Sequence, residues 1–231
     1  MDDRALTGAS RRRGRRRLSV DERREELIEA ALELFSRKAP EEISIDDVAA
    51  TAGASRALVY HYFGGKQELY LAALRSAAGR LSALLSASGD GTPLERLNAA
   101  LERYFDFVEE HAAGYLAMLR GGPASASGEV SEIVESTRVL LLDRILREFA
   151  IDSPGPVLRV TLRGWMSLVE TAALDWLQNR DLPRQELQSL LVEQHILLVH
   201  NATLRDPQLR EAYDRLVREE AEVASRALDG S

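Results

Sequence analysis

The chain has 231 residues, is rich in Ala, Leu, Glu and Arg with few β-branched runs, and carries a formal net charge of −7, so its composition predicts an all-α protein of one or two domains. No cysteine is present, which excludes disulfides, thiol catalysis and thiolate zinc sites. No apolar run approaches the roughly 20 residues of a membrane span, and the basic start lacks the apolar segment of a secretory signal, so we expect a cytoplasmic protein with no membrane partner.

Residues 1–18 form an Arg-rich arm with almost no apolar side chains, which predicts disorder when the arm is alone. Residues 1–20 hold seven Arg and two Asp, a balance of +5. Such an arm can follow the phosphates of DNA or enter the minor groove. The alternative is a tail that only increases solubility.

An amphipathic helix is predicted after the arm, ending near Ala39-Pro40. Ser19 and Glu22 match a capping box at its start. Its buried face is predicted to contain Leu27, Ile28, Ala31, Leu34 and Phe35. This helix should support the next segment from behind.

Residues 44–66, SIDDVAATAGASRALVYHYFGGK, read as two short helices joined by a tight turn. Ser44 and Asp47 match a capping box for the first helix. Gly53 provides a residue that tolerates positive φ at its end, and Ser55 caps the second helix. This is a helix-turn-helix arrangement, in which the second helix enters the major groove of DNA.

The outward-facing residues of the second helix are suited to DNA contact. Arg56 can form two hydrogen bonds with a guanine, small Ala57 lets the backbone approach the bases, and Lys66 can hold a phosphate at the next helix N-terminus. Tyr60, His61 and Tyr62 carry short, stiff donors suited to phosphate oxygens. With Phe63 they make four aromatic residues in a row, which cannot all face one core on a helix. The predicted DNA-binding residues are Ser44, Ser55, Arg56, Ala57, Tyr60, His61, Tyr62 and Lys66, together with Arg12, Arg13, Arg15 and Arg16 of the arm.

This stretch resembles the DNA-binding signature of the TetR family of transcriptional regulators over about residues 20–75. The matching residues are Phe35, Ser44, Ile45, Val48, Ala49, Ala52, Gly53, Ala54, Ser55, Leu58, Val59, Tyr60, His61, Tyr62, Phe63, Lys66, Glu68 and Leu69. The resemblance implies an all-helical homodimer that binds a palindromic double-stranded DNA operator. It further implies a repressor that releases the operator when a small, largely apolar effector binds the C-terminal domain.

The expected domains are the arm (1–18), a three-helix helix-turn-helix domain (19–66) and a helical ligand-binding and dimerisation domain (67–231). Residues 21–70 hold six Lys or Arg and eleven Asp or Glu, a balance of −5. This departs from the usual basic footprint of a DNA-binding segment. We expect the carboxylates to cluster on the first helix, away from the face between Arg56 and Lys66.

The remainder of the chain predicts a series of helices separated by Gly- and Pro-containing turns. Thr92, Pro93 and Glu95 form a strong helix start. The predicted helices span about 65–87, 92–111, 115–119, 129–149, 157–179, 183–204 and 206–228.

Aromatic and sulfur side chains of the second domain lie on helices that must pack together. Each could be ordinary core, but some are expected to line an apolar cavity between the helices, which holds an inducer in TetR-like proteins. The predicted ligand-binding residues are Tyr104, Phe107, Tyr115, Met118, Trp165, Met166 and Glu170. Glu170, the carboxylate in this set, either orients a polar group of the ligand or faces solvent.

The helices predicted at 157–179 and 184–204 are apolar on more than one side, and the surplus indicates a partner. By resemblance, they form a four-helix dimer interface with their symmetry mates. The predicted interface residues are Val169, Ala173, Trp176, Leu187, Leu191 and Leu198.

No catalytic pattern is visible in the sequence. His195 and His200 lie about 140° apart around a helix, so they cannot chelate one metal from one face. No nucleophile elbow, phosphate loop or dinucleotide fingerprint is present. We therefore expect no cofactor, no metal and no enzyme activity. The alternatives are a helical small-molecule-binding protein without sequence-specific DNA binding, and a helical enzyme.

Overall fold

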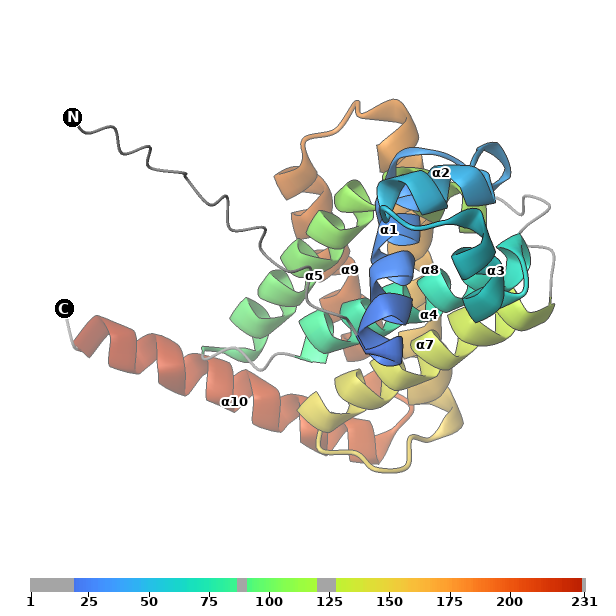
Figure 1. The fold of residues 1–231 in the computed structure, drawn as a ribbon. Helices are drawn as coiled ribbons and strands as arrows, with labels where there is room; N and C mark the ends of the chain where they lie inside the picture. Colours follow the sequence, from blue (N-terminus) through green and yellow to red (C-terminus); the bar gives the residue numbers. More distant parts are fainter. Residues whose placement is uncertain (1–18, 87–90, 120–127, 230–231) are drawn as a thin grey trace, which may run out of the picture.

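The computed structural model describes residues 19–86, 91–119 and 128–229, so the Arg-rich arm with Arg12, Arg13, Arg15 and Arg16 lies outside the described residues. The described part of the chain is all-α, as predicted (Figure 1). Its elements are α1 (Val20–Arg37), η1 (Pro40–Glu42), α2 (Ile45–Thr51), α3 (Arg56–Phe63), α4 (Lys66–Ser86), α5 (Pro93–Glu110), α6 (Ala112–Leu119), α7 (Gly128–Glu148), α8 (Pro156–Asn179), α9 (Arg184–Thr203) and α10 (Pro207–Asp229).

The helix starts follow the capping residues that the sequence predicts. The hydroxyls of Ser19, Ser44 and Thr92 each accept a hydrogen bond from the backbone amide three residues on, and each is part of a capping box. Gly53 has φ of 57°, which confirms the predicted turn between α2 and α3. The 3₁₀ turn η1 was not predicted, and Glu42 stabilises it by accepting a hydrogen bond from the Ala39 amide at 3.1 Å.

Helices α1 to α3 pack with the first half of α4 around one hydrophobic core, the N-terminal core. Its buried residues include Leu27, Ile28, Phe35, Val48, Val59, Phe63, Leu69 and Ala73. This core extends to Ala73 of α4, beyond the expected domain boundary at residue 66 where that helix begins.

The remaining helices enclose a second core, the C-terminal core, in which α8 and α9 pack against each other and against α5. Its buried residues include Leu101, Phe105, Leu158, Leu162, Trp165, Leu191 and Val199. Helix α10 lies against α9 and α5, and its C-terminal half extends beyond the body of the domain (Figure 1).

Two helices of the second domain contact the helix-turn-helix domain directly. Gly114 of α6 lies so close to α1 that a Cβ there would be 2.9 Å from the Phe35 carbonyl oxygen. Val130 and Ile133 of α7 are buried in the N-terminal core. A displacement of α6 or α7 must therefore act on the packing of the N-terminal domain.

No helix within the described ranges combines the length and apolarity that crossing a membrane requires.

Candidate nucleic-acid interface and ligand cavity

Helix α3 has a buried side and an exposed side. Val59 and Phe63 are buried in the N-terminal core, whereas Arg56, Ala57 and His61 are exposed. Tyr60 is also exposed, at 42% of its surface. The exposed side therefore presents a guanidinium, a phenol and an imidazole beside a small residue, which is a donor set suited to base edges and phosphates.

Arg56 already has partners within the helix-turn-helix. Its Nη1 donates to the Asp46 carboxylate of α2 at 3.0 Å, and Nη2 lies 3.5 Å from the Tyr60 hydroxyl. The guanidinium carbon is 5.5 Å from the centre of the Tyr60 ring. These contacts orient the Arg56 side chain on the exposed face.

Ser44 and Ser55 position the two helices through their hydroxyls. Ser44 Oγ accepts from the Asp47 amide at 3.1 Å and donates to the Asp47 carboxylate. The Ser44 hydroxyl and the Ser44 amide both donate to the Asp47 carboxylate, and these two hydrogen bonds lower the pKa of Asp47. Ser55 Oγ accepts from the Leu58 amide at 3.2 Å. Both hydroxyls therefore stabilise helix starts, independently of any role toward DNA.

Tyr62 and Lys66 lie at the end of α3 and the start of α4. Tyr62 is partly buried, packs against the N-terminal core and contacts the His61 ring edge-on with centroids 5.3 Å apart. Lys66 Nζ donates to the Glu41 carbonyl oxygen at 3.2 Å. This contact uses one of the three N–H donors of the ammonium group, so Lys66 keeps donors for a phosphate.

Most carboxylates of this domain lie on α1, as predicted. A groove between α1 and the end of α2 is lined by Asp21, Glu22, Glu25, Glu26, Glu29 and Glu33. Asp46 differs from this prediction, because it lies beside Arg56 on the α3 side. The face predicted to bind DNA therefore contains one carboxylate that was expected elsewhere.

The second domain contains a largely apolar cavity of about 530 Å³ between α5, α7, α9 and α10. A volume of that size is typical of small-molecule sites. Apolar side chains in its wall include Leu97, Ala100, Ile145, Phe149, Val199 and Leu216. Polar side chains in its wall are Arg96, Arg103, Arg144, Glu148, His195, Tyr213 and Glu220.

Of the predicted ligand-binding residues, all of which lie in the described ranges, Trp165 alone lines this cavity. The Tyr104 and Tyr115 hydroxyls hydrogen-bond each other, and burial raises the pKa of both phenols. Phe107 stacks on His111 with ring centroids 4.3 Å apart. Met166 is buried in the C-terminal core and Met118 packs between the two cores. These five side chains fill space within the described structure.

Glu170 has a protein partner. Its two carboxylate oxygens accept from Nε and Nη2 of Arg138, a paired contact between α8 and α7. Both side chains are partly buried, at 21% and 33% exposure. The carboxylate therefore joins two helices.

An apolar cavity between helices of the second domain was predicted, but the contribution of α10 to its wall was not. Tyr213, Leu216, Val217, Glu220 and Ala221 line it at spacings of three and four residues. That spacing is visible in the sequence and marks one helical face, but it does not reveal which helices the face covers.

Five of the six predicted dimer-interface residues lie in the chain's own core. They are Val169, Ala173, Trp176, Leu187 and Leu191, each at most 6% exposed. Leu198 is 41% exposed. Side chains buried within one subunit cannot also be the surface that contacts a second.

Helices α8 and α9 nevertheless expose other apolar side chains. Val160 and Leu197 are each 66% exposed, and Leu168 and Leu190 are 36% and 43% exposed. On α8, a Cβ added to Gly164 would meet no atom within 4 Å, so the backbone there is open to close approach. These residues form the apolar outer face of α8 and α9.

Two family models match the chain. The model for bacterial regulatory proteins of the tetR family covers residues 27–73, and that for the tetracyclin repressor-like C-terminal domain covers residues 93–198. The second match ends before α10, so this helix, which lines one side of the cavity, lies outside the matched region.

Individual relatives agree with these matches. The HTH-type transcriptional activator FasR of Mycolicibacterium smegmatis is 31% identical over 73% of this chain and 78% of its own length. The HTH-type transcriptional regulator BetI of Rhizobium meliloti is 34% identical over 48% of this chain and 57% of its own length.

Solved structures share the fold. A tetR-family transcriptional regulator from Streptomyces coelicolor superposes with a TM-score of 0.81 at 38% identity, over 93% of this chain and 100% of the other. The regulator FadR from Bacillus subtilis, solved in complex with stearoyl-CoA, has a TM-score of 0.58 at 16% identity, over 74% of this chain and 96% of its own. The latter likeness concerns the fold alone.

Proposed function

Because the chain belongs to the TetR family of transcriptional regulators, we propose that it binds a palindromic DNA operator as a homodimer and releases it when a small, largely apolar effector binds the second domain. The observation that carries this proposal is the exposed side of α3, where Arg56, Ala57, Tyr60 and His61 face away from the core. A recognition helix needs such a side to enter the major groove.

Dimerisation through α8 and α9 is the second part of the proposal. Proteins of this family generally form dimers, and paired half-sites require two recognition helices at a fixed spacing. We propose that the contact is made by the apolar outer face of α8 and α9, including Val160, Leu168, Leu190 and Leu197. Gly164 would let the two α8 backbones approach closely.

The effector is the third part. The FadR structure was solved with stearoyl-CoA, and the cavity of this chain is mainly apolar. Both support a ligand with a large apolar part. Repression is the proposed direction of regulation, although FasR is named an activator, and a reporter under the chain's own promoter distinguishes the two by the sign of its response.

The test of DNA binding is an electrophoretic shift on the chain's own promoter region. Tyr60→Ala and Lys66→Ala should each weaken binding by about 1–3 kcal/mol, while the helical circular-dichroism signal stays unchanged. Arg226→Ala is the matched control, because Arg226 is an exposed cation on α10 and its loss should leave the shift unchanged.

A different outcome would favour a second function. The net charge of −5 over residues 21–70 fits a helical small-molecule-binding protein that does not bind DNA sequence-specifically. That function predicts no shift on the promoter and no enrichment of any fragment in a genomic selection. If Tyr60→Ala unfolds the protein, Tyr60 has a structural role.

A further inference from the structure

We infer that the cavity lined by α10 takes a single-chain anionic amphiphile, with its chain among the apolar side chains and its acidic head between Arg96 and Arg144. The inference rests on the proposed function only in treating this molecule as the effector. Binding itself can be measured on the protein without DNA.

The interior of the cavity is suited to a hydrocarbon chain. Its wall includes Leu97, Phe149, Trp165, Val199 and Leu216, which come from different parts of the second domain. The Trp165 indole N–H donates to the Leu191 carbonyl oxygen at 3.0 Å, so its polar atom is already satisfied and its ring presents an apolar surface. A chain placed here would gain hydrophobic free energy with each methylene buried.

Two guanidiniums in the wall share one carboxylate. Arg96 Nε lies 3.1 Å from one oxygen of Glu148, and Arg144 Nη2 lies 3.1 Å from the other. Arg96 and Arg144 are 20% and 21% exposed, and Glu148 is 33% exposed. This arrangement is a site where a carboxylate sits between two partly buried arginines, so its geometry fits a ligand carboxylate as well.

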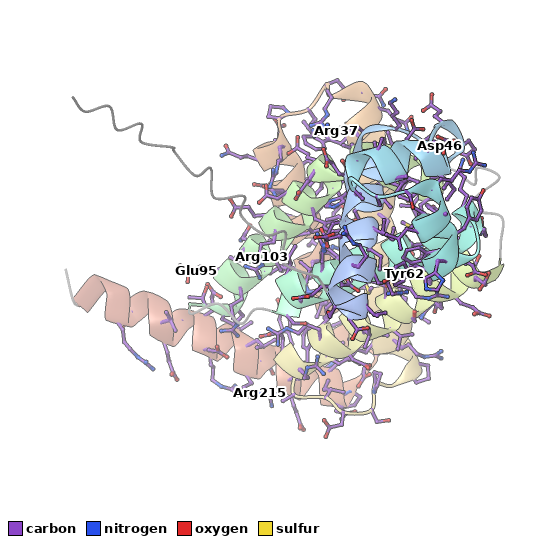
Figure 2. All side chains as sticks on the ribbon, in the orientation of Figure 1. Arg37, Asp46, Tyr62, Glu95, Arg103 and Arg215 are labelled. Atoms are coloured by element: carbon purple, nitrogen blue, oxygen red, sulfur yellow. The ribbon has the colours of Figure 1, made fainter. Side chains whose placement is uncertain are left out.

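The surroundings also favour an anion. Arg103 adds a third guanidinium to the wall (labelled on α5 in Figure 2). Glu220 accepts a hydrogen bond from the Leu94 amide at 3.0 Å, at the N-terminus of α5. The positive end of that helix therefore offsets the charge of Glu220. Outside the wall, Glu219 also pairs with Arg96 at 3.0 Å, so Arg96 has two carboxylate partners, whereas the ion pair of Arg144 is with Glu148.

The ligand head would compete with Glu148 for Arg144. Arg144 and Glu148 lie at the C-terminal end of α7. Val130 and Ile133, near the N-terminal end of the same helix, are buried in the N-terminal core. Displacing the Glu148 carboxylate breaks its ion pair with Arg96 of α5. The resulting shift of α7 is transmitted along this one helix to the DNA-binding domain. The same site therefore provides a route from ligand to DNA affinity.

Calorimetry on the full chain tests the chemical class with three probes that share one chain: dodecanoate, dodecanol and dodecyltrimethylammonium, each below its micelle concentration. Dodecanoate should bind most tightly and dodecyltrimethylammonium most weakly. Within a series of shorter and longer carboxylates, affinity should rise about fourfold per methylene until the cavity is full. Equal affinity for all three probes, or preference for the cation, would overturn the inference.

Variants of the two α7 residues separate the head from the chain. Arg144→Gln should weaken dodecanoate about tenfold and leave dodecanol unchanged. Glu148→Gln should strengthen dodecanoate, since the competing carboxylate is lost. Arg147→Gln is the matched control, because Arg147 is exposed on α7 and is not part of the wall.

Ala100→Trp locates the site, since Ala100 lines the cavity and the larger side chain should abolish binding of dodecanoate and dodecanol while the circular-dichroism spectrum is retained. If Ala100→Trp unfolds the chain, Arg144→Gln and Glu148→Gln with opposite effects still support the site. Dodecanoate affinity that none of the variants changes would place the ligand elsewhere. A promoter shift that persists with any of these results leaves the DNA-binding proposal standing.

Discussion

Arg56 of α3 and Asp46 of α2 form an ion pair at 3.0 Å on the face that we propose contacts DNA. Both side chains are exposed, at 60% and 62%, so water screens the pair and it contributes little to folding. Its consequence concerns binding. The carboxylate neutralises a cation that would otherwise be available to phosphates, and it holds the Arg56 guanidinium in place on the exposed side of α3.

Asp46→Asn should raise affinity for random DNA more than affinity for the operator, so that the preference for the operator falls. The reason is that Arg56 becomes free to neutralise a phosphate, and each added phosphate contact steepens the salt slope by about 0.9. A dimer should therefore show a slope steeper by about two. Titrations of operator and random DNA at several salt concentrations measure both quantities.

The control for Asp46→Asn is Glu25→Gln, which removes one carboxylate from the exposed face of α1. It should leave both the slope and the preference nearly unchanged. Equal behaviour of the two variants would mean that Asp46 acts only through net charge.

The local features of the fold could be predicted because they depend on neighbouring residues. Ser44, Ser55 and Gly53 fix the limits of two helices through contacts within three residues, and the structure confirms them. The pair between Asp46 and Arg56 was not predicted, since it joins two helices across a turn whose angle the sequence pattern does not specify.

The second domain shows what helical periodicity leaves open. The apolar positions of α8 and α9 were identified, but periodicity does not tell which of two apolar sides is internal. Leu191 and Val169 are predicted interface residues, but both are buried in the core of the domain. Leu197 is not among the predicted residues, yet it is exposed. Of the predicted aromatic set, Trp165 lines the cavity, whereas the Tyr104 and Tyr115 hydroxyls hydrogen-bond each other.

Leu197→Glu and Leu191→Glu form a matched pair that tests the dimer interface. Leu197 is 66% exposed and Leu191 is 1% exposed, on the same helix. Leu197→Glu should give a folded monomer at micromolar concentration with lost operator affinity, because paired half-sites need two modules. Leu191→Glu should unfold the domain, because it buries a charge without a partner.

Sedimentation gives the mass and circular dichroism gives the helix content of both variants. A dimeric Leu197→Glu protein with normal operator binding would show that another surface holds the subunits together, and the apolar outer face of α8 and α9 would lose its proposed role.

The arm offers six closely spaced Arg (11–13 and 15–17) to DNA, whereas residues 21–70 carry a negative balance. Deleting residues 1–17 should lower overall DNA affinity and flatten the plot of log affinity against log salt by several units per dimer. Preference for the operator should change less, unless Arg side chains read a narrow minor groove, in which case A·T-rich flanks lose their advantage. Equal slopes for the full and shortened chains would show that the arm does not touch DNA.

His195 predicts a pH dependence of stability that comes from the cavity. Its ring lies 4.4 Å from the Trp165 ring, and its Nδ1 is buried without a hydrogen-bond partner in the described structure. Burial lowers the pKa of His195 to about 4, from 6.5. The folded state therefore binds fewer protons than the unfolded state between these values, so the free energy of unfolding should be highest above about pH 6.5 and fall by up to about 3 kcal/mol toward pH 4.

Urea unfolding between pH 4.5 and 7.5 measures this loss. His195→Phe should lose less stability on acidification than the parent chain, since Phe removes the group that must stay neutral. Glu148 and Glu220 line the same cavity and are present in both proteins, so the difference between the two curves isolates the imidazole. His200→Phe, a change at an exposed position on the same helix, should follow the parent curve. If His195→Phe also follows it, the His195 imidazole is charged in the folded protein and lies in contact with solvent.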